Sequence, residues 1–409
     1  MTISAILDKA LVGRELTVEE GELLFSAQGS ELQDLVAAAD EVRRSRVGDR
    51  VTYVVNRNIN FTNVCVKRCG FCAFSRGHRA EEGYFLPIDE VVRRAREAWD
   101  LGASEVCIQA GLPPKMNGSY YVDLCRAVKE AVPGVHLHGF SPEEVLYGAE
   151  LSNSTIEAYL ERLKEAGVGS LPGTSAEILD DEVREIISPG RISTLEWVHV
   201  ITAAHRLGIP TTSTVMYGHI ETPRHRARHL ALLRDIQKET GGITEFVPLN
   251  FIHSEAPMSL KGLIPGLRAG PSVEDVLRMY AVSRLMLHGW IHNIQLSWVK
   301  QGLELARRCL DAGANDFGGT LINESISTAA GAQHGQFLRP SKIRGLIREA
   351  GRLPAERSTT YQILRTFESE PDEPEVLDRV ADAKGRFGSY HQLVSSGQFR
   401  FRQIGVKEL

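Results

Sequence analysis

Apolar positions along the chain change from a helical to a mixed spacing. Residues 3–46 repeat apolar side chains at intervals of three and four, as at Leu32, Leu35 and Ala39, and this spacing predicts short amphipathic helices. From Val51 onward, short apolar runs that suit strands alternate with amphipathic stretches over about 270 residues. Such alternation predicts parallel strands joined by crossover helices, which is an α/β fold.

Eight apolar runs are predicted as strands. They cover residues 51–61, 105–110, 136–140, 169–171, 211–217, 245–252, 291–298 and 316–321. Amphipathic stretches fill the intervals, and glycines such as Gly102 and Gly208 follow helices where a C-terminal cap is expected. An open doubly wound sheet would give much the same pattern. A (β/α)8 TIM-type barrel is preferred because the strand count matches and no Gly-x-Gly-x-x-Gly motif follows the first strand.

The barrel is expected to carry helical extensions at both ends. The predicted division is a helical N-terminal extension at 1–50, the barrel at 51–325, a C-terminal helical segment at 326–367, and an acidic linker and tail at 368–409. Residues 368–378 hold six acids, two prolines and no Lys or Arg, which is typical of a solvated linker. Four aromatic residues beyond it predict that the last segment packs back on the protein. These are Phe387, Tyr390, Phe399 and Phe401.

Composition places the chain among globular proteins rather than fibrous, disordered or membrane proteins. It has 409 residues, of which 43% are hydrophobic and 24% charged. No apolar run approaches the ~18 residues of a spanning helix, and residues 1–14 lack the features of a signal peptide, so a cytoplasmic location and no membrane association are expected. The 47 basic and 52 acidic residues give a formal charge of −5, which gives little support for nucleic-acid binding.

Three of the six cysteines fall within eight residues, at Cys65, Cys69 and Cys72. Cytosolic thiols stay reduced, so such a group is expected to bind metal or to do chemistry rather than to form a disulfide. The other three stand alone and are interpreted as small core residues. They are Cys107, Cys125 and Cys309.

Two kinds of metal site suit three close thiols. Structural zinc takes four protein ligands, and His78 could complete a three-cysteine, one-histidine site; the chain would then be a zinc-stabilised binding protein. No second Cys-x2-Cys pair exists to support this alternative. A 4Fe-4S cluster held by three cysteines instead leaves one iron open to a cofactor.

The spacing Cys-x3-Cys-x2-Cys, with Phe71 directly before the last cysteine, resembles the radical S-adenosylmethionine superfamily. This resemblance implies that Cys65, Cys69 and Cys72 bind a 4Fe-4S cluster. In the superfamily the cofactor binds the open iron, and one electron cleaves it to methionine and a 5′-deoxyadenosyl radical. The resemblance also implies a set of residues that bind S-adenosylmethionine. This set is Phe71, Gln109, Gly111, His138 and Glu177.

Two members of that set also have simpler interpretations. Gly111 would equally suit an ordinary glycine turn. Glu177 opens a predicted helix, where a carboxylate favours the helix dipole.

Further motifs resemble the branch that contains deazaflavin and menaquinone-pathway enzymes, and within it the CofH family. They lie at residues 55–65, 215–219, 245–253, 295–300 and 316–324, and the likeness spans roughly residues 50–365. Ser297-Trp-Val-Lys300 and Ser325-Ile-Ser-Thr-Ala-Ala-Gly-Ala-Gln-His334 favour CofH over its siblings. Those siblings, aminofutalosine synthase and dehypoxanthine futalosine cyclase, remain the alternatives within the same chemistry.

The resemblance to CofH implies a transferase. It would join the 4-hydroxybenzyl group of L-tyrosine to 5-amino-6-(D-ribitylamino)uracil, releasing 2-iminoacetate, methionine and 5′-deoxyadenosine, in biosynthesis of the deazaflavin coenzyme precursor. The implied partners are subunit 1 of the deazaflavin synthase, which would close the ring, and a protein that donates electrons.

Polar residues near the predicted strand ends are the candidates for catalysis. Each could also be a satisfied structural residue, so only their convergence on one face of a barrel favours a catalytic role. The candidates are Glu177, Tyr217, His253, Lys300 and Glu324. Further candidates without an assigned role are His138, His219, Asn250, Ser297 and Asp316.

Overall fold

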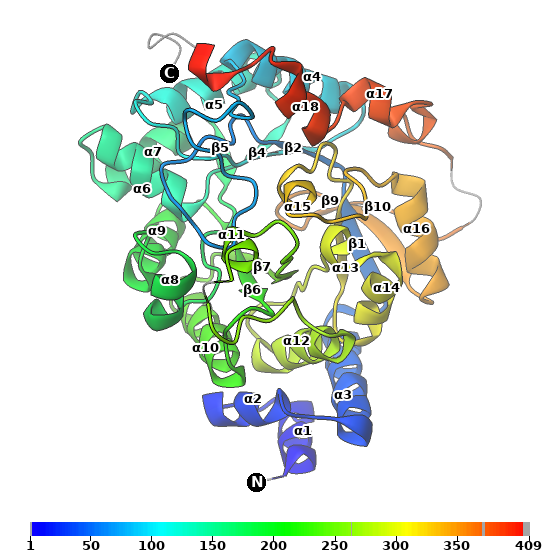
Figure 1. The fold of residues 1–409 in the computed structure, drawn as a ribbon. Coiled ribbons are helices and arrows are strands. Elements are labelled where there is room, and N and C mark those ends of the chain that lie inside the picture. The colour runs from blue at the N-terminus through cyan, green and yellow to red at the C-terminus, as the bar shows by residue number, and fades with distance from the viewer. Residues whose placement is uncertain (1, 263, 370–372, 404–409) are drawn as a thin grey trace.

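A computed structural model describes residues 2–262, 264–369 and 373–403 (Figure 1). The chain begins with three helices, α1 (Ile3–Leu11), α2 (Val18–Leu24) and α3 (Gly29–Val47), which form the predicted N-terminal extension. The side chain of Thr17 accepts a hydrogen bond from the backbone N–H of Glu20, and the Glu20 carboxylate accepts one from Thr17, so a capping box starts α2. The three helices pack against one side of the α/β body, where α3 contacts α12 (Val273–Met286) and α2 contacts α10 (Pro223–Thr240).

The strands form three sheets, in which neighbouring strands run parallel except at one edge. One sheet has the order β10-β9-β1-β8, the second β2-β3-β4-β5, and the third β6-β7. The strands are β1 (Arg50–Val54), β2 (Asn56–Ile59), β3 (Glu105–Ile108), β4 (His136–His138), β5 (Val168–Ser170), β6 (Thr211–Tyr217), β7 (Ile243–Asn250), β8 (Asp316–Gly319), β9 (Leu353–Arg357) and β10 (Ile363–Thr366). Only the pairing of β9 with β10 among these ladders is antiparallel.

Isolated bridges connect the three sheets. They join Leu171 to Thr211, Phe246 to Ile294, Gln295 to Asp316, and Arg57 to Ile322. The links follow the cyclic order in which the strands of a barrel would stand. Helices follow the strands on the outside, as Figure 1 shows.

Amphipathic stretches form the helices that cover the strands. In α4, the side chains of Val91, Ala95 and Ala98 are buried on one face, as their spacing of three and four requires. The helices are α4 (Ile88–Asp100), α5 (Tyr120–Ala131), α6 (Pro142–Leu151), α7 (Ile156–Glu165), α8 (Asp181–Ile187), α9 (Thr194–Arg206), α10 (Pro223–Thr240), α11 (Pro257–Leu260), α12 (Val273–Met286), α13 (Trp298–Gln301), α14 (Leu303–Asp311), α15 (Ile326–Ala329), α16 (Pro340–Glu349), α17 (Ala383–Phe387) and α18 (Tyr390–Ser396). Together they bury a core that extends from the first helix to the last.

The strand predicted at 291–298 does not form a regular ladder. Ile294 and Gln295 make only isolated bridges, and the chain then enters α13. Backbone hydrogen bonds still join it to both neighbours, since Gln295 donates its N–H to the Phe246 carbonyl at 3.0 Å and Leu296 donates to the Asp316 carbonyl at 2.9 Å. The N–H of Ile294 instead donates to the Asn315 side-chain oxygen at 2.9 Å. The strand predicted at 51–61 is likewise divided into β1 and β2.

A hairpin occurs where the sequence predicted only helix. Within 326–367, α15 and α16 are followed by β9 and β10, and β9 pairs in parallel with β1, with Tyr53 opposite Glu356. The limits of 51–325 for the barrel stay a prediction, because β9 from the following segment extends the same sheet.

The segment after the acidic linker packs back on the protein, as expected. Its helices α17 and α18 lie beside α4 in Figure 1. The Phe401 ring lies 6.3 Å from that of Phe85, and the Tyr390 ring lies 5.7 Å from that of Phe74. Residues 370–372 of the linker and 404–409 of the tail lie outside the described residues.

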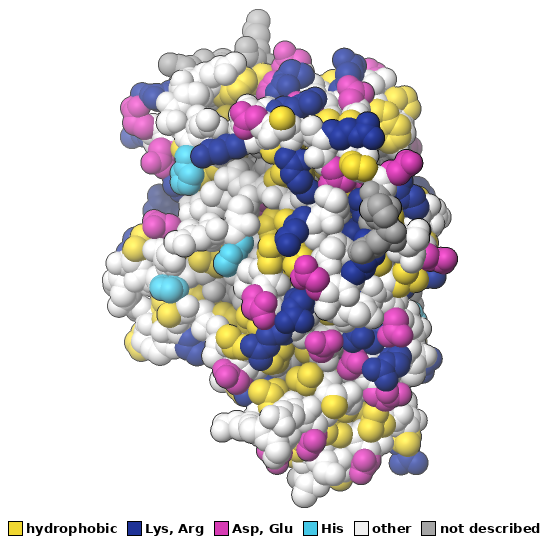
Figure 2. Space-filling model, turned by 90° about the vertical axis from the view of Figure 1, so that its right-hand side faces the viewer, with side chains coloured by type: hydrophobic (Ala, Val, Ile, Leu, Met, Phe, Trp, Pro, Cys, Tyr) yellow, Lys and Arg dark blue, Asp and Glu magenta, His cyan; other side chains and the backbone are white. Residues whose placement is uncertain are grey.

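Two surface properties bear on possible partners. Among the described residues, no helix is long and apolar enough to cross a membrane. On the face drawn in Figure 2, basic and acidic side chains are interspersed.

Candidate active site

A cavity of about 400 Å³ begins at the loops that follow the strands and continues into the interior. Its lining contains all three clustered cysteines. It also contains most of the other site residues that the sequence singled out, namely Phe71, Gln109, Gly111, His138, Glu177, Lys300 and Glu324. The structure thus brings residues from six or more separate segments to one site.

The cysteine loop follows β2 and is held by backbone hydrogen bonds on several sides. Cys65 donates its N–H to the Arg76 carbonyl at 3.0 Å, and Val66 donates to the Leu112 carbonyl at 2.8 Å. Gly70 donates to the Ile187 carbonyl at 2.8 Å. These contacts fix the loop against three other segments before any ligand is bound.

The three thiols suit a cluster better than a single ion. Cys69 is buried, Cys65 and Cys72 are partly buried, and none of the three forms a disulfide. Burial raises the pKa of the Cys65 thiol and raises that of Cys69 to about 12, so a cation is needed to stabilise both thiolates. Within the described residues, no three Cys, His, Asp or Glu side chains converge on one metal position. In an iron–sulfur cluster each cysteine ligates a different iron, so its thiols need not converge on one point, whereas zinc requires convergence.

Arg191 joins the cysteine loop to three other polar groups. Its guanidinium donates to Glu143 Oε2 at 3.0 Å, to Glu177 Oε1 at 2.8 Å and to Ser175 Oγ at 2.6 Å. Its Nη1 also lies 3.6 Å from Cys69 Sγ. Burial alone would lower the pKa of Arg191, but the neighbouring Glu177, Cys69 and Glu143 raise it well above its usual value.

Sequence reasoning did not identify Arg191. It lies on the loop after α8, 14 residues beyond Glu177, and no spacing rule connects the two. The only sequence signal was a lone arginine after Pro189-Gly190 at a helix end.

Glu177 is held in an uncommon backbone conformation beside this arginine. Its φ is 40°, and that of Ser175 is 63°, both in the left-handed region that residues with a side chain seldom adopt. One carboxylate oxygen accepts from Arg191, while Oε2 is buried and has no hydrogen-bond partner among the described residues. A buried acceptor without a donor suits a polar group of a bound ligand.

Gln109 and Gly111 lie directly against the cysteine loop. Gln109 Oε1 accepts a hydrogen bond from Thr174 at 2.8 Å, and Gly111 donates its N–H to the Thr62 carbonyl at 2.9 Å. A Cβ on Gly111 would lie 2.3 Å from the Val64 carbonyl oxygen, so glycine is required here by the neighbouring backbone itself.

Lys300 and Glu324 line the cavity near Cys72. Burial lowers the pKa of Lys300, although the charge of Glu324 opposes this effect. Burial also raises the pKa of Glu324, whose carboxylate accepts from the Ser327 N–H at 2.9 Å. A cation and a carboxyl group therefore face the cavity from neighbouring segments.

The remaining predicted residues lie in three different settings. His138 lines the deeper part of the cavity, shares a hydrogen bond of 2.7 Å with Ser170, and burial lowers its pKa to about 4. Tyr217 is fully buried and donates to Asn250, but it does not line the cavity. His253 is exposed on the loop after β7, also outside the lining. The catalytic roles of Tyr217 and His253 and the cofactor-binding role of His138 stay predictions.

Two family models cover most of the chain. Residues 59–233 match the radical SAM superfamily, and residues 240–370 match the CofH/MqnC C-terminal region. A 5-amino-6-(D-ribitylamino)uracil–L-tyrosine 4-hydroxyphenyl transferase of Methanothermobacter thermautotrophicus is 51% identical over 87% of this chain and 96% of the relative. The chain belongs to the CofH family.

Other CofH relatives agree with this assignment. The enzyme of the same name from Methanocaldococcus jannaschii is 49% identical over 85% of this chain and 94% of its own. An FO synthase of Streptomyces coelicolor is 49% identical over 85% of this chain, which corresponds to 40% of that longer protein.

Solved structures show the same fold. Methylornithine synthase PylB aligns with a TM-score of 0.64 at 20% identity, over 85% of this chain and 95% of its own. The hydrogenase maturase HydG from Carboxydothermus hydrogenoformans aligns with a TM-score of 0.68 at 18% identity, over 88% and 80%. The α/β radical S-adenosylmethionine fold is therefore confirmed for this CofH-family chain.

Proposed function

We propose that this chain transfers the 4-hydroxybenzyl group of L-tyrosine to 5-amino-6-(D-ribitylamino)uracil in biosynthesis of the deazaflavin coenzyme precursor. One observation carries the proposal. The clustered cysteines, a buried arginine–carboxylate network and a lysine–glutamate pair line one cavity, in a chain that aligns over most of its length with relatives named for this reaction.

Cys65, Cys69 and Cys72 would hold a 4Fe-4S cluster that leaves one iron for S-adenosylmethionine. When bound, this cofactor supplies a 5′-deoxyadenosyl radical that takes a hydrogen atom from the substrate. The cluster requires thiolates, and the buried Arg191 beside Cys69 favours that charged form. We also propose that the protein is located in the cytoplasm, where reducing conditions keep these thiols from forming disulfides.

Ser175, Glu177 and Arg191 would orient the polar end of the cofactor. Arg191 already holds one oxygen of Glu177, which leaves Oε2 of that carboxylate as an acceptor for an ammonium group. The positive φ values of Ser175 and Glu177 indicate that the surrounding contacts fix these side chains in place before binding.

Lys300 and Glu324 would bind the amino-acid end of tyrosine. The ammonium of Lys300 suits the carboxylate of tyrosine, and burial of both groups strengthens their attraction relative to water. The carboxyl group of Glu324 lies close enough to Lys300 to affect its pKa, and it would accept from the amine of tyrosine. Cleavage of the Cα–Cβ bond would then release 2-iminoacetate, and the benzylic fragment would add to the uracil ring.

The adduct would pass to subunit 1 of the deazaflavin synthase, and an electron-donor protein would reduce the cluster. The interspersed charge on the face in Figure 2 does not favour a nucleic-acid partner. Aminofutalosine synthase and the futalosine cyclase remain second candidates, because the C-terminal family model is shared with MqnC.

An anaerobic product assay tests the proposal. Reconstituted protein that is given both substrates should form 5′-deoxyadenosine and the tyrosine–uracil adduct together, in a constant ratio. Cleavage of the cofactor only with a futalosine-pathway substrate would favour the siblings. A colourless protein that holds stoichiometric zinc and takes up no iron would favour the zinc-stabilised alternative.

Cysteine substitution tests the ligand set. Cys65→Ala, Cys69→Ala and Cys72→Ala should each abolish 5′-deoxyadenosine formation and lower the iron content, while the far-UV circular dichroism stays unchanged. Cys125→Ala, which removes a buried thiol outside the cavity, is the control and should retain iron. Full cofactor cleavage by any one of the three variants would refute the assignment.

A further inference from the structure

The cavity has a second polar region opposite the cysteine loop, to which no role has been given so far. Glu105 is the first residue of β3 and Glu245 the third of β7, so both lie toward the end of the strands away from the loops that carry the cysteines. Arg357, at the end of β9, reaches the same level because β9 pairs with β1, which precedes β2. Five polar residues line the cavity at that depth: Glu105, Glu245, Gln295, Arg357 and Thr359. These five are called the cavity floor below.

The C-terminal hairpin contributes two of the five. Arg357 is the last residue of β9, and Thr359 lies in the turn that leads to β10. Arg357 Nη2 donates to Asp316 Oδ1 at 3.0 Å and to Gln295 Oε1 at 3.2 Å, and lies 3.5 Å from Glu245 Oε2. These contacts hold the Arg357 guanidinium between the strands and the hairpin, beside the other polar groups of the floor.

The floor keeps unused hydrogen-bonding capacity although its side chains are buried. Asn56 Nδ2 donates to Glu105 Oε1 at 2.9 Å, and Thr359 lies beside the same carboxylate. Thr359 is only 6% exposed, yet its hydroxyl makes no hydrogen bond of acceptable geometry among the described residues. A buried hydroxyl that lies against a carboxylate without a well-aligned hydrogen bond can still bond a hydroxyl group of a ligand in the cavity.

The charges of the floor select the kind of ligand. Glu105 and Glu245 line it, and Asp316 lies directly behind them, so a carboxylate ligand would be repelled. Arg357 pairs with Asp316 and approaches Glu245, so part of the negative charge of the floor is already balanced. An uncharged chain of hydroxyl groups, which both donate and accept, fits a surface that alternates carboxylates, amides and a guanidinium.

We propose that the cavity floor binds the hydroxyl groups of the ribityl chain of the uracil substrate, with Glu105 and Thr359 as contacts that determine specificity. The proposal rests on the proposed function and places the two substrates along one axis. Tyrosine, a zwitterion, lies next to Lys300 and Glu324 near the cysteines, and the uncharged polyol reaches the opposite end. The uracil ring then lies between them, where the benzylic fragment is released.

A binding experiment with a matched ligand pair tests the floor directly. Reconstituted protein is titrated anaerobically with 5-amino-6-(D-ribitylamino)uracil and with 5-amino-6-(n-pentylamino)uracil, which has the same chain length and no hydroxyl groups. Wild type should bind the ribityl compound at least about tenfold more tightly, the value of one hydrogen bond to a charged group. In Glu105→Gln and in Thr359→Val this preference should shrink several-fold, while the KM for tyrosine stays the same.

The control is Glu356→Gln. It makes the same glutamate-to-glutamine change as Glu105→Gln, at the residue of β9 that precedes Arg357. Glu356 does not line the cavity, so this variant should keep the full preference for the ribityl compound. Thr359→Val tests the floor independently if Glu105→Gln fails to fold.

The two possible failures, of the floor proposal and of the proposed function, give different results. If wild type forms the adduct but both floor variants retain the full preference, the floor does not contact the hydroxyl groups and the proposal is wrong. If wild type forms no adduct from tyrosine and the ribityl compound, the proposed function itself is wrong, and the substrate assignment of the floor is withdrawn with it.

Discussion

Arg191 connects more of the candidate site than any other single residue described above. It is the shared partner of Glu143 and Glu177, which are both largely buried. Replacing it with alanine would leave the buried carboxylate of Glu177 without a cation and Glu143 with only Lys67, whose Nζ lies 3.1 Å from Glu143 Oε1. Breaking such a buried pair costs about 3 to 5 kcal/mol in the free energy of unfolding. We therefore expect Arg191→Ala to lower the midpoint of guanidinium unfolding strongly and to abolish 5′-deoxyadenosine formation.

An exposed arginine provides the comparison for that variant. The side chain of Arg228 is 52% exposed, and it lies 3.9 Å from Asp180. Arg228→Ala should change the free energy of unfolding by less than about 1 kcal/mol. Equal effects of the two substitutions would show that Arg191 has no special part in holding the site together.

Gly111 makes a second prediction for a single residue. A methyl group there would overlap the Val64 carbonyl, one residue before Cys65, so the backbone of the cysteine loop would have to move. Such overpacking costs about 1 to 3 kcal/mol. Gly111→Ala should lower the iron retained after reconstitution, whereas Gly77→Ala, in the same loop with open space around its Cα, should not. Iron and acid-labile sulfide assays measure the difference.

What the sequence could reveal about single residues depended on local spacing. The cysteines were recognisable because cluster chemistry imposes a short, ordered spacing on one loop. Arg191, Arg357 and Thr359 were not, because each reaches the cavity only through long-range packing, and an isolated arginine or threonine has many ordinary roles. Tyr217 shows the opposite error. Its place at a strand end predicted a site residue, but its side chain is buried against Asn250 and does not line the cavity.

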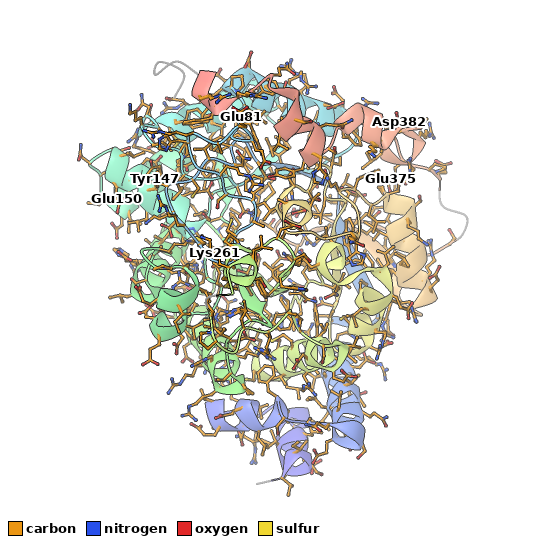
Figure 3. All side chains as sticks on the ribbon, viewed as in Figure 1. Glu81, Tyr147, Glu150, Lys261, Glu375 and Asp382 are labelled. Atoms are coloured by element: carbon orange, nitrogen blue, oxygen red, sulfur yellow. The ribbon has the colours of Figure 1, made fainter. Side chains whose placement is uncertain are left out.

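At the scale of elements, the C-terminal segment is a strap across the cysteine loop. Phe85 donates its N–H to the Phe399 carbonyl at 2.8 Å, and Phe401 donates to the Gly83 carbonyl at 2.9 Å. Glu81, labelled in Figure 3, pairs with Arg400 and Arg402 at 2.5 Å each. Segments about 300 residues apart are thus joined by backbone bonds, charges and aromatic contacts.

Removing this strap should loosen the loop without unfolding the strands. Deletion of residues 383–409 exposes the Phe74 and Phe85 rings and frees the backbone of residues 83–85. We expect faster amide hydrogen exchange across residues 60–86 and faster loss of iron in air. The double variant Arg400→Ala/Arg402→Ala, which removes only exposed ion pairs, should lie close to wild type. Unchanged exchange in the deletion variant would contradict a bracing role.

The pattern of elements could be predicted where periodicity alone determines structure. Seven of the eight predicted strand positions carry regular strands, because buried parallel strands are apolar and short. At 291–298 the strand is reduced to two bridged residues, because the Ile294 N–H bonds the Asn315 side chain and the chain enters α13 at Trp298. The β9–β10 hairpin was missed because charged residues such as Glu356 and Arg357 interrupt its apolar pattern, and Arg357 is retained inside only by its buried partners.

At the scale of the whole molecule, buried groups make opposing contributions to stability as pH changes. Burial lowers the pKa of His138 and His205 to about 4 and that of His229 to about 3, so as pH falls below about 6.5 the unfolded chain takes up protons that the folded chain refuses, and stability is lost. Burial raises the pKa of Glu144 and Glu245 to about 7, so their contribution is lost instead as pH rises from about 4.5 to 7.

These two trends oppose each other between about pH 4.5 and 6.5, so removing one histidine should change how the free energy of unfolding depends on pH. His229 accepts at Nδ1 from the Leu179 N–H and donates at Nε2 to the Thr214 carbonyl, so glutamine can replace both contacts without a titrating group. In His229→Gln, the free energy of unfolding should fall with rising pH relative to wild type, by up to about 1.4 kcal/mol per pH unit for one proton. Guanidinium unfolding at half-unit steps of pH measures this slope. His199→Gln, at a side chain that is 48% exposed, is the control. A His229→Gln profile parallel to that of wild type would mean that the pKa of His229 is the same in the folded and unfolded chain, so that burial does not lower it.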